Sequence, residues 1–256
     1  VLGSLVVGYV VLPSLGSQRT LGLVSGLFAL ASVAVSWPYL RLPRRAYMLV
    51  TAVGLTLVGL LSPRWDLARM TGGYNVYFDW GRGPETILWA REDTQGGVTT
   101  VTEKAGVHTL LTNGKFQGND GHEMSAQRGF AHYPALFVKD FRRALVVGLG
   151  TGVTLDTILK YPFEKVEVAE ISPAIVTASR NYFAGVGGVA LDDPRVTLSL
   201  EDGRNHLFVS DARYDLIGIE LSSVWFAGAG SLYSREFYQL VKARMRVSSQ
   251  AHSPQQ

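Results

Sequence analysis

Apolar positions are spread unevenly along the chain, and the first sixty residues carry the longest runs. Residues 20–37 and 46–62 contain no charged side chain, and each is about as long as the shortest helix that crosses a hydrocarbon core of about 30 Å. The chain also opens in an apolar run, residues 1–12, interrupted only by Gly, Ser and Tyr. A buried helix of a soluble protein is usually shorter, and a signal peptide is a single segment with a basic flank. We therefore expect residues 1–66 to form transmembrane helices, as a fragment of a multi-span region.

Between residues 74 and 117 the pattern changes to short runs rich in β-forming residues. Residues 86–90, 98–102 and 107–111 are the candidate strands, and Asn113-Gly114 has the composition of a hairpin turn. A helix is expected over residues 122–137, with a break near Pro134. The pattern predicts a small antiparallel β-stranded domain with a connecting helix over residues 67–140.

From residue 141 onward, candidate strands and helices alternate. The strands are expected at 144–147, 165–170, 195–200 and 214–220, and the helices at 153–160, 173–183, 205–210 and 234–245. This alternation predicts a Rossmann-like α/β domain over residues 141–256, in which helices cover both faces of a doubly wound parallel sheet. The polar tail after Met245 has no strand character, so we expect an open sheet edge and a truncated domain.

The first strand of this domain leads into a candidate ligand site. The sequence ALVVGLGTG at 144–152 places Gly148, Gly150 and Gly152 at alternate positions, and the second strand ends in Glu170. A glycine turn brings the backbone close to a nucleotide, and an acid at the tip of the second strand can accept both ribose hydroxyls. The pattern predicts a site for an adenosine-type ligand. The plainer alternative is a tight strand-to-helix turn with a surface glutamate.

Composition narrows the functional classes. The 256 residues carry a net charge of +3 with neutral histidines, and they include no cysteine. Disulfides and thiolate metal sites are therefore excluded, and the five histidines lack metal-ligand spacing, so we expect no metal. Arg41, Arg44 and Arg45 lie between the two apolar segments, and Arg64 and Arg69 follow the second. This placement suits the flanks of a lipid bilayer better than a nucleic-acid surface.

From residue 74 onward the chain resembles the spermidine synthase (polyamine aminopropyltransferase) family. It is most similar to the bacterial branch in which that domain is fused to a multi-span membrane region. The resemblance is carried by NGKFQ at 113–117, His132 with Pro134, VVGLGTG at 146–152, VEVAEISP at 166–173, LDDPRVTLSLEDGRNHL at 191–207, YDLIGIE at 214–220 and SLYSREFYQL at 231–240. It implies a small β-stranded domain followed by a Rossmann-like domain of the S-adenosylmethionine-dependent methyltransferase type.

The resemblance also implies a role for each matching position. Gln117 would lie on the ribose side of the nucleoside. The turn beneath it would be formed by Gly148, Gly150, Thr151 and Gly152. Glu170 would accept hydrogen bonds from the ribose hydroxyls and Asp202 from the adenine amino group, because a carboxylate is a good acceptor for both. The alternative for Asp202 is an N-cap of the following helix, and the two roles are compatible.

Several positions depart from the family pattern. Thr151 stands where the active enzymes have an acid that holds the donor's amine, and Ala126 replaces a tyrosine. After the fourth strand the chain reads ELSS at 220–223, so Glu220 remains an acid and Ser223 replaces the family's base. An amine with a pKa of about 10 is mostly protonated at neutral pH, so its attack needs a carboxylate base. Three other acids are candidates to compensate: Asp120, Glu123 and Asp211.

The resemblance implies a membrane-anchored aminopropyltransferase with Glu220 and Ser223 at the catalytic positions. Its donor would be decarboxylated S-adenosylmethionine, and its acceptor a polyamine such as putrescine. One alternative is a methyltransferase that uses S-adenosylmethionine itself, because loss of the amine-holding acids suits a donor with a carboxylate. Another is a non-catalytic module that binds a nucleoside or polyamine for a membrane protein. The fold alone does not choose between them.

The apolar segments predict a multi-pass protein of the cell membrane. The cytoplasmic pool of the donor favours a cytoplasmic soluble domain. The basic loop with Arg41, Arg44 and Arg45 favours the opposite side, because one further span would then carry the domain outside. A homo-oligomer is an open alternative to a monomer.

Overall fold

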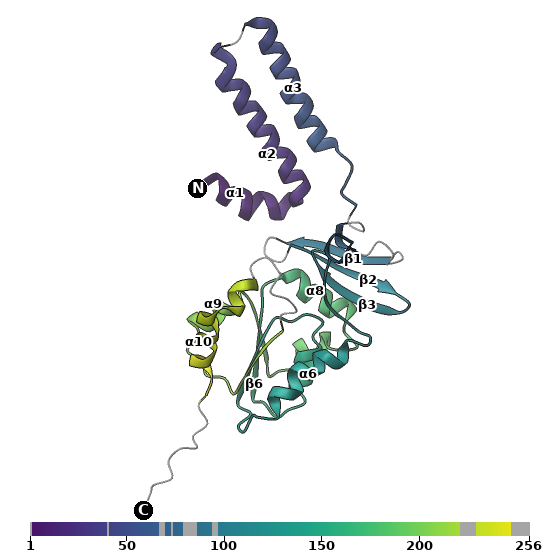
Figure 1. Ribbon diagram of the computed structural model, residues 1–256, viewed down its shortest axis with the longest axis vertical. Coiled ribbons are helices and arrows are strands. Elements are labelled where there is room, and N and C mark those ends of the chain that lie inside the picture. Colours follow the sequence, from purple (N-terminus) through teal and green to yellow (C-terminus); the bar gives the residue numbers. More distant parts are fainter. Residues whose placement is uncertain are drawn as a thin grey trace, which may run out of the picture. The chain divides into compact units, whose positions relative to one another are not determined.

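The computed structural model describes residues 2–39, 41–66, 70–72, 74–78, 86–93, 97–220 and 229–246. The chain divides into two compact units (Figure 1). One unit holds residues 1–67 with 92–94, and the other holds residues 68–91 with 95–256.

The first unit is helical. It consists of α1 (Leu2–Val6), a π-helical turn (Val7–Val11), α2 (Leu12–Ser36), a 3-10 turn (Trp37–Tyr39) and α3 (Leu42–Leu61). The long helix α2 is kinked at Gly16, where φ is 76°. Figure 1 shows α2 and α3 side by side. A Cβ on Gly22 would lie 3.0 Å from the carbonyl oxygen of Gly59, so small residues allow this close approach.

Both apolar segments predicted as spans are helical. The stretches Leu2–Tyr39, with a mean hydropathy of 1.7, and Leu42–Leu61, with 1.4, are long and apolar enough to cross a membrane. Only 22% and 6% of their most apolar windows are buried. Large side chains such as Phe28, Leu55 and Val58 are more than 60% exposed. Their length, composition and exposure suit a lipid environment, because the core helix of a soluble protein is mostly buried.

The second unit begins with an antiparallel sheet. The strands β1 (Thr86–Asp93), β2 (Gly97–Lys104), β3 (Val107–Thr112) and β4 (Lys115–Asn119) follow that order across the sheet, and the β2–β3 and β3–β4 pairs are antiparallel. Asn113 and Gly114 both have positive φ and form the predicted two-residue hairpin. The sequence analysis identified this turn but not β4, the strand on its far side. The helices of this region are α5 (Tyr74–Tyr77) and α6 (Met124–Ala135), and Pro134 lies in the last turn of α6.

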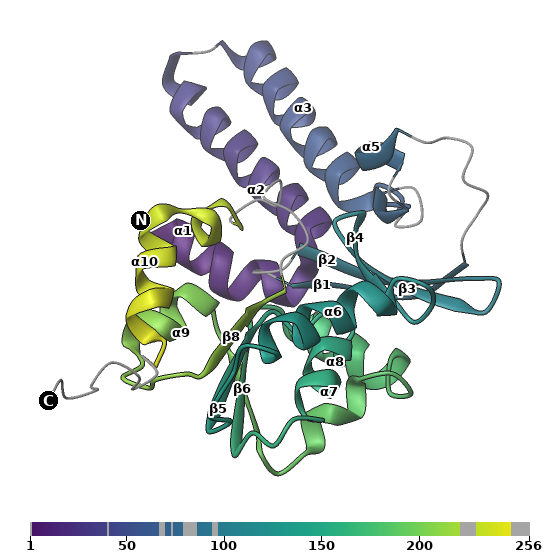
Figure 2. The same ribbon diagram turned by 60° about the horizontal axis from the view of Figure 1, so that its bottom comes forward.

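The second sheet is parallel, as the alternating pattern predicted. Its strands β5 (Arg143–Val147), β6 (Lys165–Glu170), β7 (Val196–Leu200) and β8 (Leu216–Ile219) take the order β7-β6-β5-β8. The helices are α7 (Val153–Ile158), α8 (Pro173–Tyr182), α9 (Gly203–Val209) and α10 (Arg235–Arg244), with 3-10 turns at Gly188–Asp192 and Ala229–Tyr233. Figure 2 shows α6, α7 and α8 on one face of this sheet and α9 and α10 on the other, so the sheet is doubly wound.

Strand β5 supplies side chains to both hydrophobic layers. Ala144 and Val146 belong to the core that also contains residues of α6, α7 and α8, and Leu145 and Val147 belong to the core that contains residues of α9 and α10. All four are buried. The alternation follows from the two-residue period of a strand, and burial on both faces explains why the β5 sequence is continuously apolar.

The chain after α10 returns to the sheet. Tyr214 N donates to the carbonyl oxygen of Arg244 at 2.9 Å, and Arg246 N donates to the carbonyl oxygen of Tyr214 at 2.8 Å. These bonds form a parallel bridge between Tyr214 and Met245 just before β8. The sequence analysis expected no strand pairing after Met245. The residues beyond Arg246 lie outside the described part of the chain.

Candidate active site

The glycine turn between β5 and α7 requires glycine for two reasons. Gly148, Gly150 and Gly152 have φ values of 89°, 55° and 85°, which disfavour any residue with a Cβ. A Cβ on Gly148 would also lie 2.9 Å from the carbonyl oxygen of Glu220, and one on Gly152 would lie 2.7 Å from that of Gly187. The turn therefore fits closely between the end of β8 and the loop that follows α8.

Glu170 ends β6 directly beside this turn. It is only 3% exposed. Its Oε2 accepts a hydrogen bond from the backbone N–H of Leu149 at 2.8 Å, and its Oε1 accepts one from Ser172 at 2.8 Å. The alternative of a surface glutamate is therefore wrong. Its contact with ribose hydroxyls stays a prediction.

Glu220, the residue after β8, faces the same turn. A Cβ on Gly150 would lie 3.6 Å from Glu220 Oε1. Within the described chain, both carboxylate oxygens of Glu220 are buried without a hydrogen-bond partner. Burial raises the pKa of Glu220 to about 8, and the negative charge of Glu170 adds to that rise. The Thr154 hydroxyl, which donates to the carbonyl oxygen of Gln127 at 3.0 Å, opposes the effect of burial on this pKa more than the charge of Glu170 adds to it.

Thr151, in the middle of the glycine turn, is fully buried and already hydrogen-bonded. Its hydroxyl donates to Oε1 of Gln127, whose Nε2 donates to the carbonyl oxygen of Asn119 at 3.2 Å. The position that the family fills with an acid is therefore part of a neutral network. The sequence analysis missed Gln127. A signal was present, because Gln127 shares the buried face of α6 with Ala131 and Ala135.

Asp202 caps the N-terminus of α9. Its side chain accepts the N–H of Asn205 at 2.8 Å, so the capping alternative is confirmed. Glu170 pairs with Leu200 across β6 and β7, and Asp202 follows two residues later. Glu170 and Asp202 therefore lie at the same edge of the sheet, the carboxyl edge where such sheets bind ligands. The contact of Asp202 with adenine stays a prediction.

Gln117 lies at an irregularity of β4. Leu110 pairs with Gly118 while Leu111 pairs with Phe116, so Gln117 is an extra residue in a β-bulge. Bulges often re-aim a side chain beside an active site. The next residue packs closely on the turn region, since a Cβ on Gly118 would lie 3.0 Å from Thr151 Cγ2. The structure thus places β4 against the glycine turn, and the nucleoside contact of Gln117 stays a prediction.

The remaining predicted groups lie elsewhere. Ser223 falls within residues 221–228, outside the described part of the chain. Asp120 accepts from both the backbone N–H and Nδ1 of His108 at 2.7 Å. The Asp211 carboxylate is fully exposed, 3.8 Å from Arg244. Asp120 is therefore paired with His108 and Asp211 faces solvent beside Arg244, and the role of either acid as a compensating base stays a prediction.

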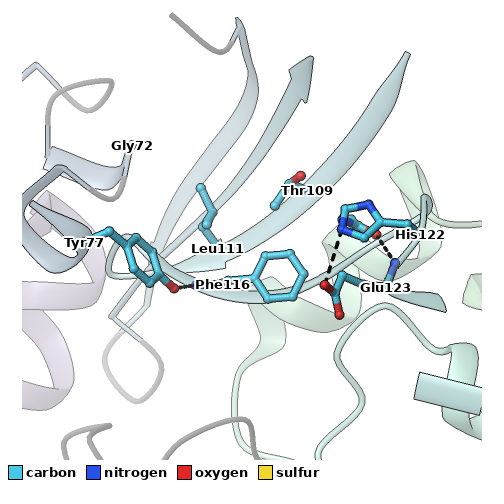
Figure 3. A pocket seen from close by; sticks show the side chains of 8 residues that line it. Gly72, Tyr77, Thr109, Leu111, Phe116, His122 and Glu123 are labelled. Carbon is cyan, nitrogen blue, oxygen red and sulfur yellow. Dashed lines mark hydrogen bonds and ion pairs between the residues drawn. The ribbon is translucent and has the colours of Figure 1, made fainter. Parts of the chain in front are cut away.

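Glu123 belongs to a separate cavity of about 380 Å³ on the antiparallel sheet. Figure 3 shows Glu123 and His122 at one end of this cavity, Tyr77 at the other, and Thr109, Leu111 and Phe116 between them. Tyr77 accepts the N–H of Phe116 at 2.9 Å, and His122 Nε2 lies 3.3 Å from Glu123 Oε1. The lining residues do not include the glycine turn. A role for Glu123 as the compensating base stays a prediction.

A glycine turn after the first strand and acids at or just after the ends of the next two, on a doubly wound parallel sheet, define a Rossmann-like domain. In the described residues, no group of three or more His, Cys, Asp or Glu side chains could hold a metal ion. Residues 123–255, more than half of the chain, match the spermine/spermidine synthase domain family. The chain belongs to this family.

Curated relatives extend the match in both directions. A polyamine aminopropyltransferase of Corynebacterium efficiens is 27% identical over 95% of this chain and 47% of its own length. One of Nitrosomonas europaea is 33% identical over 54% of this chain and 42% of its own length. A putrescine N-methyltransferase 2 of Nicotiana tabacum is 32% identical over 56% of this chain and 42% of its own length. The chain spans about half the length of the curated relatives it matches.

Solved structures support the fold. A crystal structure of spermidine synthase in complex with the transition state analogue AdoDATO superposes with a TM-score of 0.59 at 21% identity. The match covers 63% of this chain and 55% of that chain. This similarity confirms the predicted fold class.

Proposed function

We propose that this chain is the donor-binding part of a membrane-anchored aminopropyltransferase. It would transfer the aminopropyl group of decarboxylated S-adenosylmethionine to a polyamine such as putrescine. The observation that carries this proposal is the buried carboxyl group of Glu220 against the glycine turn, which has no hydrogen-bond partner among the described residues. A cationic amine brought to this position would supply the missing partner, and the family membership makes an amine the expected substrate.

The donor nucleoside would lie along the carboxyl edge of the parallel sheet. Glu170 would accept from the ribose hydroxyls while holding the turn through Leu149. Asp202 would accept from the adenine amino group while capping α9. Gln117 would approach from the bulge of β4. In each case the protein bond fixes the side chain before the ligand arrives, which reduces the ordering cost of binding.

The transfer needs one base and no redox partner. The acceptor nitrogen attacks the methylene carbon next to the sulfonium, the carbon–sulfur bond breaks, and its electron pair neutralises the sulfur. The ammonium form of the acceptor must first lose a proton. Glu220 is protonated in the free chain at neutral pH, because its pKa is about 8. Binding of the cationic acceptor would favour the charged form of Glu220, which would release its own proton to solvent. The resulting carboxylate would then accept the proton of the acceptor ammonium, so that the neutral amine can attack. Ser223 would be a neighbouring polar group rather than the base.

The apolar helices would anchor the enzyme in the cell membrane. The alignment with the Corynebacterium efficiens relative covers 95% of this chain and therefore includes most of the helical unit. The exposed apolar side chains of α2 and α3 support the same proposal. A cytoplasmic second unit would have direct access to the donor pool.

A second candidate function is methyl transfer from S-adenosylmethionine to the same class of amine. It is favoured by Thr151, whose neutral hydrogen bond to Gln127 replaces the acid that holds the donor's amine in the family. Without that acid, the carboxylate of S-adenosylmethionine meets less repulsion. The similarity to a putrescine N-methyltransferase supports this candidate as well.

A product assay on the full chain in lipid nanodiscs separates these functions. Putrescine is supplied with either donor, and the products are identified by mass spectrometry. Spermidine from the decarboxylated donor supports aminopropyl transfer, and N-methylputrescine from S-adenosylmethionine supports methyl transfer. Glu220→Gln should reduce either rate by about 10²–10⁴-fold, the usual contribution of a general base. The matched control is Glu236→Gln, at an exposed position of α10. Absence of product with intact nucleoside binding would indicate the non-catalytic alternative.

A further inference from the structure

A buried ionic cluster lies beneath α9, on the sheet face opposite α7 and α8. His206 of α9 is 8% exposed and lies between two carboxylates. Its Nδ1 is 2.7 Å from Glu201 Oε1, and its Nε2 is 3.1 Å from Glu167 Oε2. The Tyr214 hydroxyl donates to the same Oε2 of Glu167 at 2.7 Å and lies 3.3 Å from His206 Nε2, and Arg143 Nε lies 3.5 Å from Glu167 Oε1. The cluster joins β5, β6, the turn before α9 and the segment before β8.

The geometry fixes the protonation state of the imidazole. Ionised carboxylates only accept hydrogen bonds, so both ring nitrogens of His206 must donate. His206 is therefore an imidazolium when both contacts are made. Its charge and that of Arg143 then balance the charges of Glu167 and Glu201. The remaining nearby cation, Arg244 of α10, donates to the carbonyl oxygens of Leu207 and Phe208 at the other end of α9.

The titration behaviour of the cluster agrees with this state. The hydrogen bond to Glu167 raises the pKa of His206, burial opposes that rise, and the bond to Glu201 adds to it. The bond to His206 lowers the pKa of Glu167 more than burial raises it. Burial and the bond to Glu167 raise the pKa of Tyr214 to about 12. His206 thus loses its charge at a higher pH than an ordinary histidine.

The two carboxylates that His206 joins each adjoin a predicted ligand-binding acid. Glu167 lies in β6 three residues before Glu170, and Glu201 immediately precedes Asp202. The imidazolium therefore cross-links β6 to the turn that carries Asp202. Loss of its proton leaves one ring nitrogen with a lone pair that faces a carboxylate, so one of the two contacts must break. Glu201, which is one-third exposed, can be solvated by water, and Glu167 retains Tyr214 and Arg143.

We propose that His206 is a positioning residue for the donor nucleoside. As an imidazolium it holds the Glu201–Asp202 turn against β6, and as a neutral imidazole it releases that turn. This inference rests on the proposed nucleoside role of Asp202. It adds a dependence on pH that acts through the placement of Asp202 rather than through the reacting atoms.

The test measures binding of 5′-methylthioadenosine to the full chain by titration calorimetry from about pH 6 to about pH 9, the range in which a histidine with a raised pKa loses its proton. This probe carries the adenine and ribose that both candidate donors share, so its binding does not depend on which group is transferred. The informative variant is Glu201→Gln. Its amide can donate to a neutral His206 Nδ1 while Nε2 still donates to Glu167, so the bridge no longer needs the proton. Glu236→Gln on exposed α10 is the control with the same change of charge.

Wild type should lose affinity relative to Glu201→Gln as pH rises, by about fivefold, the lower end of typical coupling between sites. Glu220 titrates in the same range but is present in both proteins, so its effect cancels in their ratio. The ratio of wild type to Glu236→Gln should stay constant. A wild-type to Glu201→Gln ratio that does not change with pH overturns the proposal.

A second measurement separates failure of this proposal from failure of the donor site. The backbone amide of Asn205 is hydrogen-bonded to the Asp202 carboxylate, so its nitrogen-15 resonance reports the turn without ligand. That resonance should shift with the titration of His206 in wild type and not in Glu201→Gln. If 5′-methylthioadenosine does not bind at any pH, the proposed function fails, and an Asn205 resonance that follows His206 still establishes the link. An Asn205 resonance that does not shift as His206 titrates refutes the proposed link between His206 and the turn that carries Asp202.

Discussion

Replacement of Glu220 by Gln should stabilise the second unit while it removes the transfer activity. The folded-state pKa of Glu220 is about 8, against an ordinary value of 4.5. When folding raises the pKa of a group, its contribution to stability is fully present at pH values below the pKa in the unfolded chain. That contribution is lost as the pH rises through the pKa in the folded protein. At about 1.4 kcal/mol per pKa unit, this loss amounts to at most about 5 kcal/mol between those two pH values. Water penetration and structural relaxation reduce this loss of stability, and we expect a loss of about 2–3 kcal/mol.

The variant isolates this contribution because Gln does not ionise. The difference in free energy of unfolding between Glu220→Gln and wild type should be near zero at about pH 4.5 and should grow until about pH 8. His206 and Glu167 also titrate, but they are present in both proteins and cancel. Hydrogen exchange of the β5 amides, corrected for the intrinsic effect of pH, reports opening of the parallel sheet alone. Glu164→Gln at an exposed position is the control. A difference that does not vary with pH would show that the carboxyl group of Glu220 is hydrated rather than buried.

Two further changes test the nucleoside edge of the sheet. Glu170→Gln should weaken 5′-methylthioadenosine binding by about 1.5–3 kcal/mol, the scale of a lost hydrogen bond to a charged group. Titration calorimetry measures this affinity. An unchanged affinity would show that Glu170 only holds the backbone of Leu149. Gly203→Ala should destabilise the second unit by about 1–3 kcal/mol through overpacking, because its Cβ would lie 2.3 Å from Val147 Cγ1. The control is Gly185→Ala, because a Cβ on Gly185 would have no other atom within 4 Å. Equal hydrogen-exchange protection in the two variants would contradict the packing argument.

Local patterns in the sequence were enough to predict the parallel sheet. Strand β5 is apolar after Arg143, strand β6 is half apolar, and turn residues separate both from helices, so the sequence indicated where each strand begins and ends. The hairpin at Asn113-Gly114 was readable for the same reason. Strand β4 was missed because KFQGN contains neither alternation nor β-branched residues. It is held by pairing with β3 and by packing on the glycine turn, and tertiary contacts of this kind do not appear in a local pattern.

Only some of the polar contacts of the site could be predicted from the sequence. The glycine spacing and Glu170 could be predicted because a strand, a turn and a terminal acid have a fixed order. The Thr151–Gln127 pair could not, because its members are 24 positions apart and belong to different domains of the sequence prediction. The cluster around His206 was missed for a related reason: Glu167 lies 39 positions away from His206, in β6, and the local sequence does not indicate this contact.

The two acids beside the glycine turn are suited to different tasks by their surroundings. Glu170 accepts two backbone N–H groups, and such bonds favour the charged form of a carboxyl group. It is thus suited to remain an acceptor for ribose throughout a reaction. Glu220 has no such bonds in the described chain and lies close enough to Glu170 for that charge to raise its pKa further. A pair of carboxyl groups separated in this way provides one permanent anion and one group that can exchange a proton near neutral pH. In the proposed function, the same desolvation that costs stability would create a base that is ionised by its own cationic substrate, for aminopropyl and for methyl transfer alike.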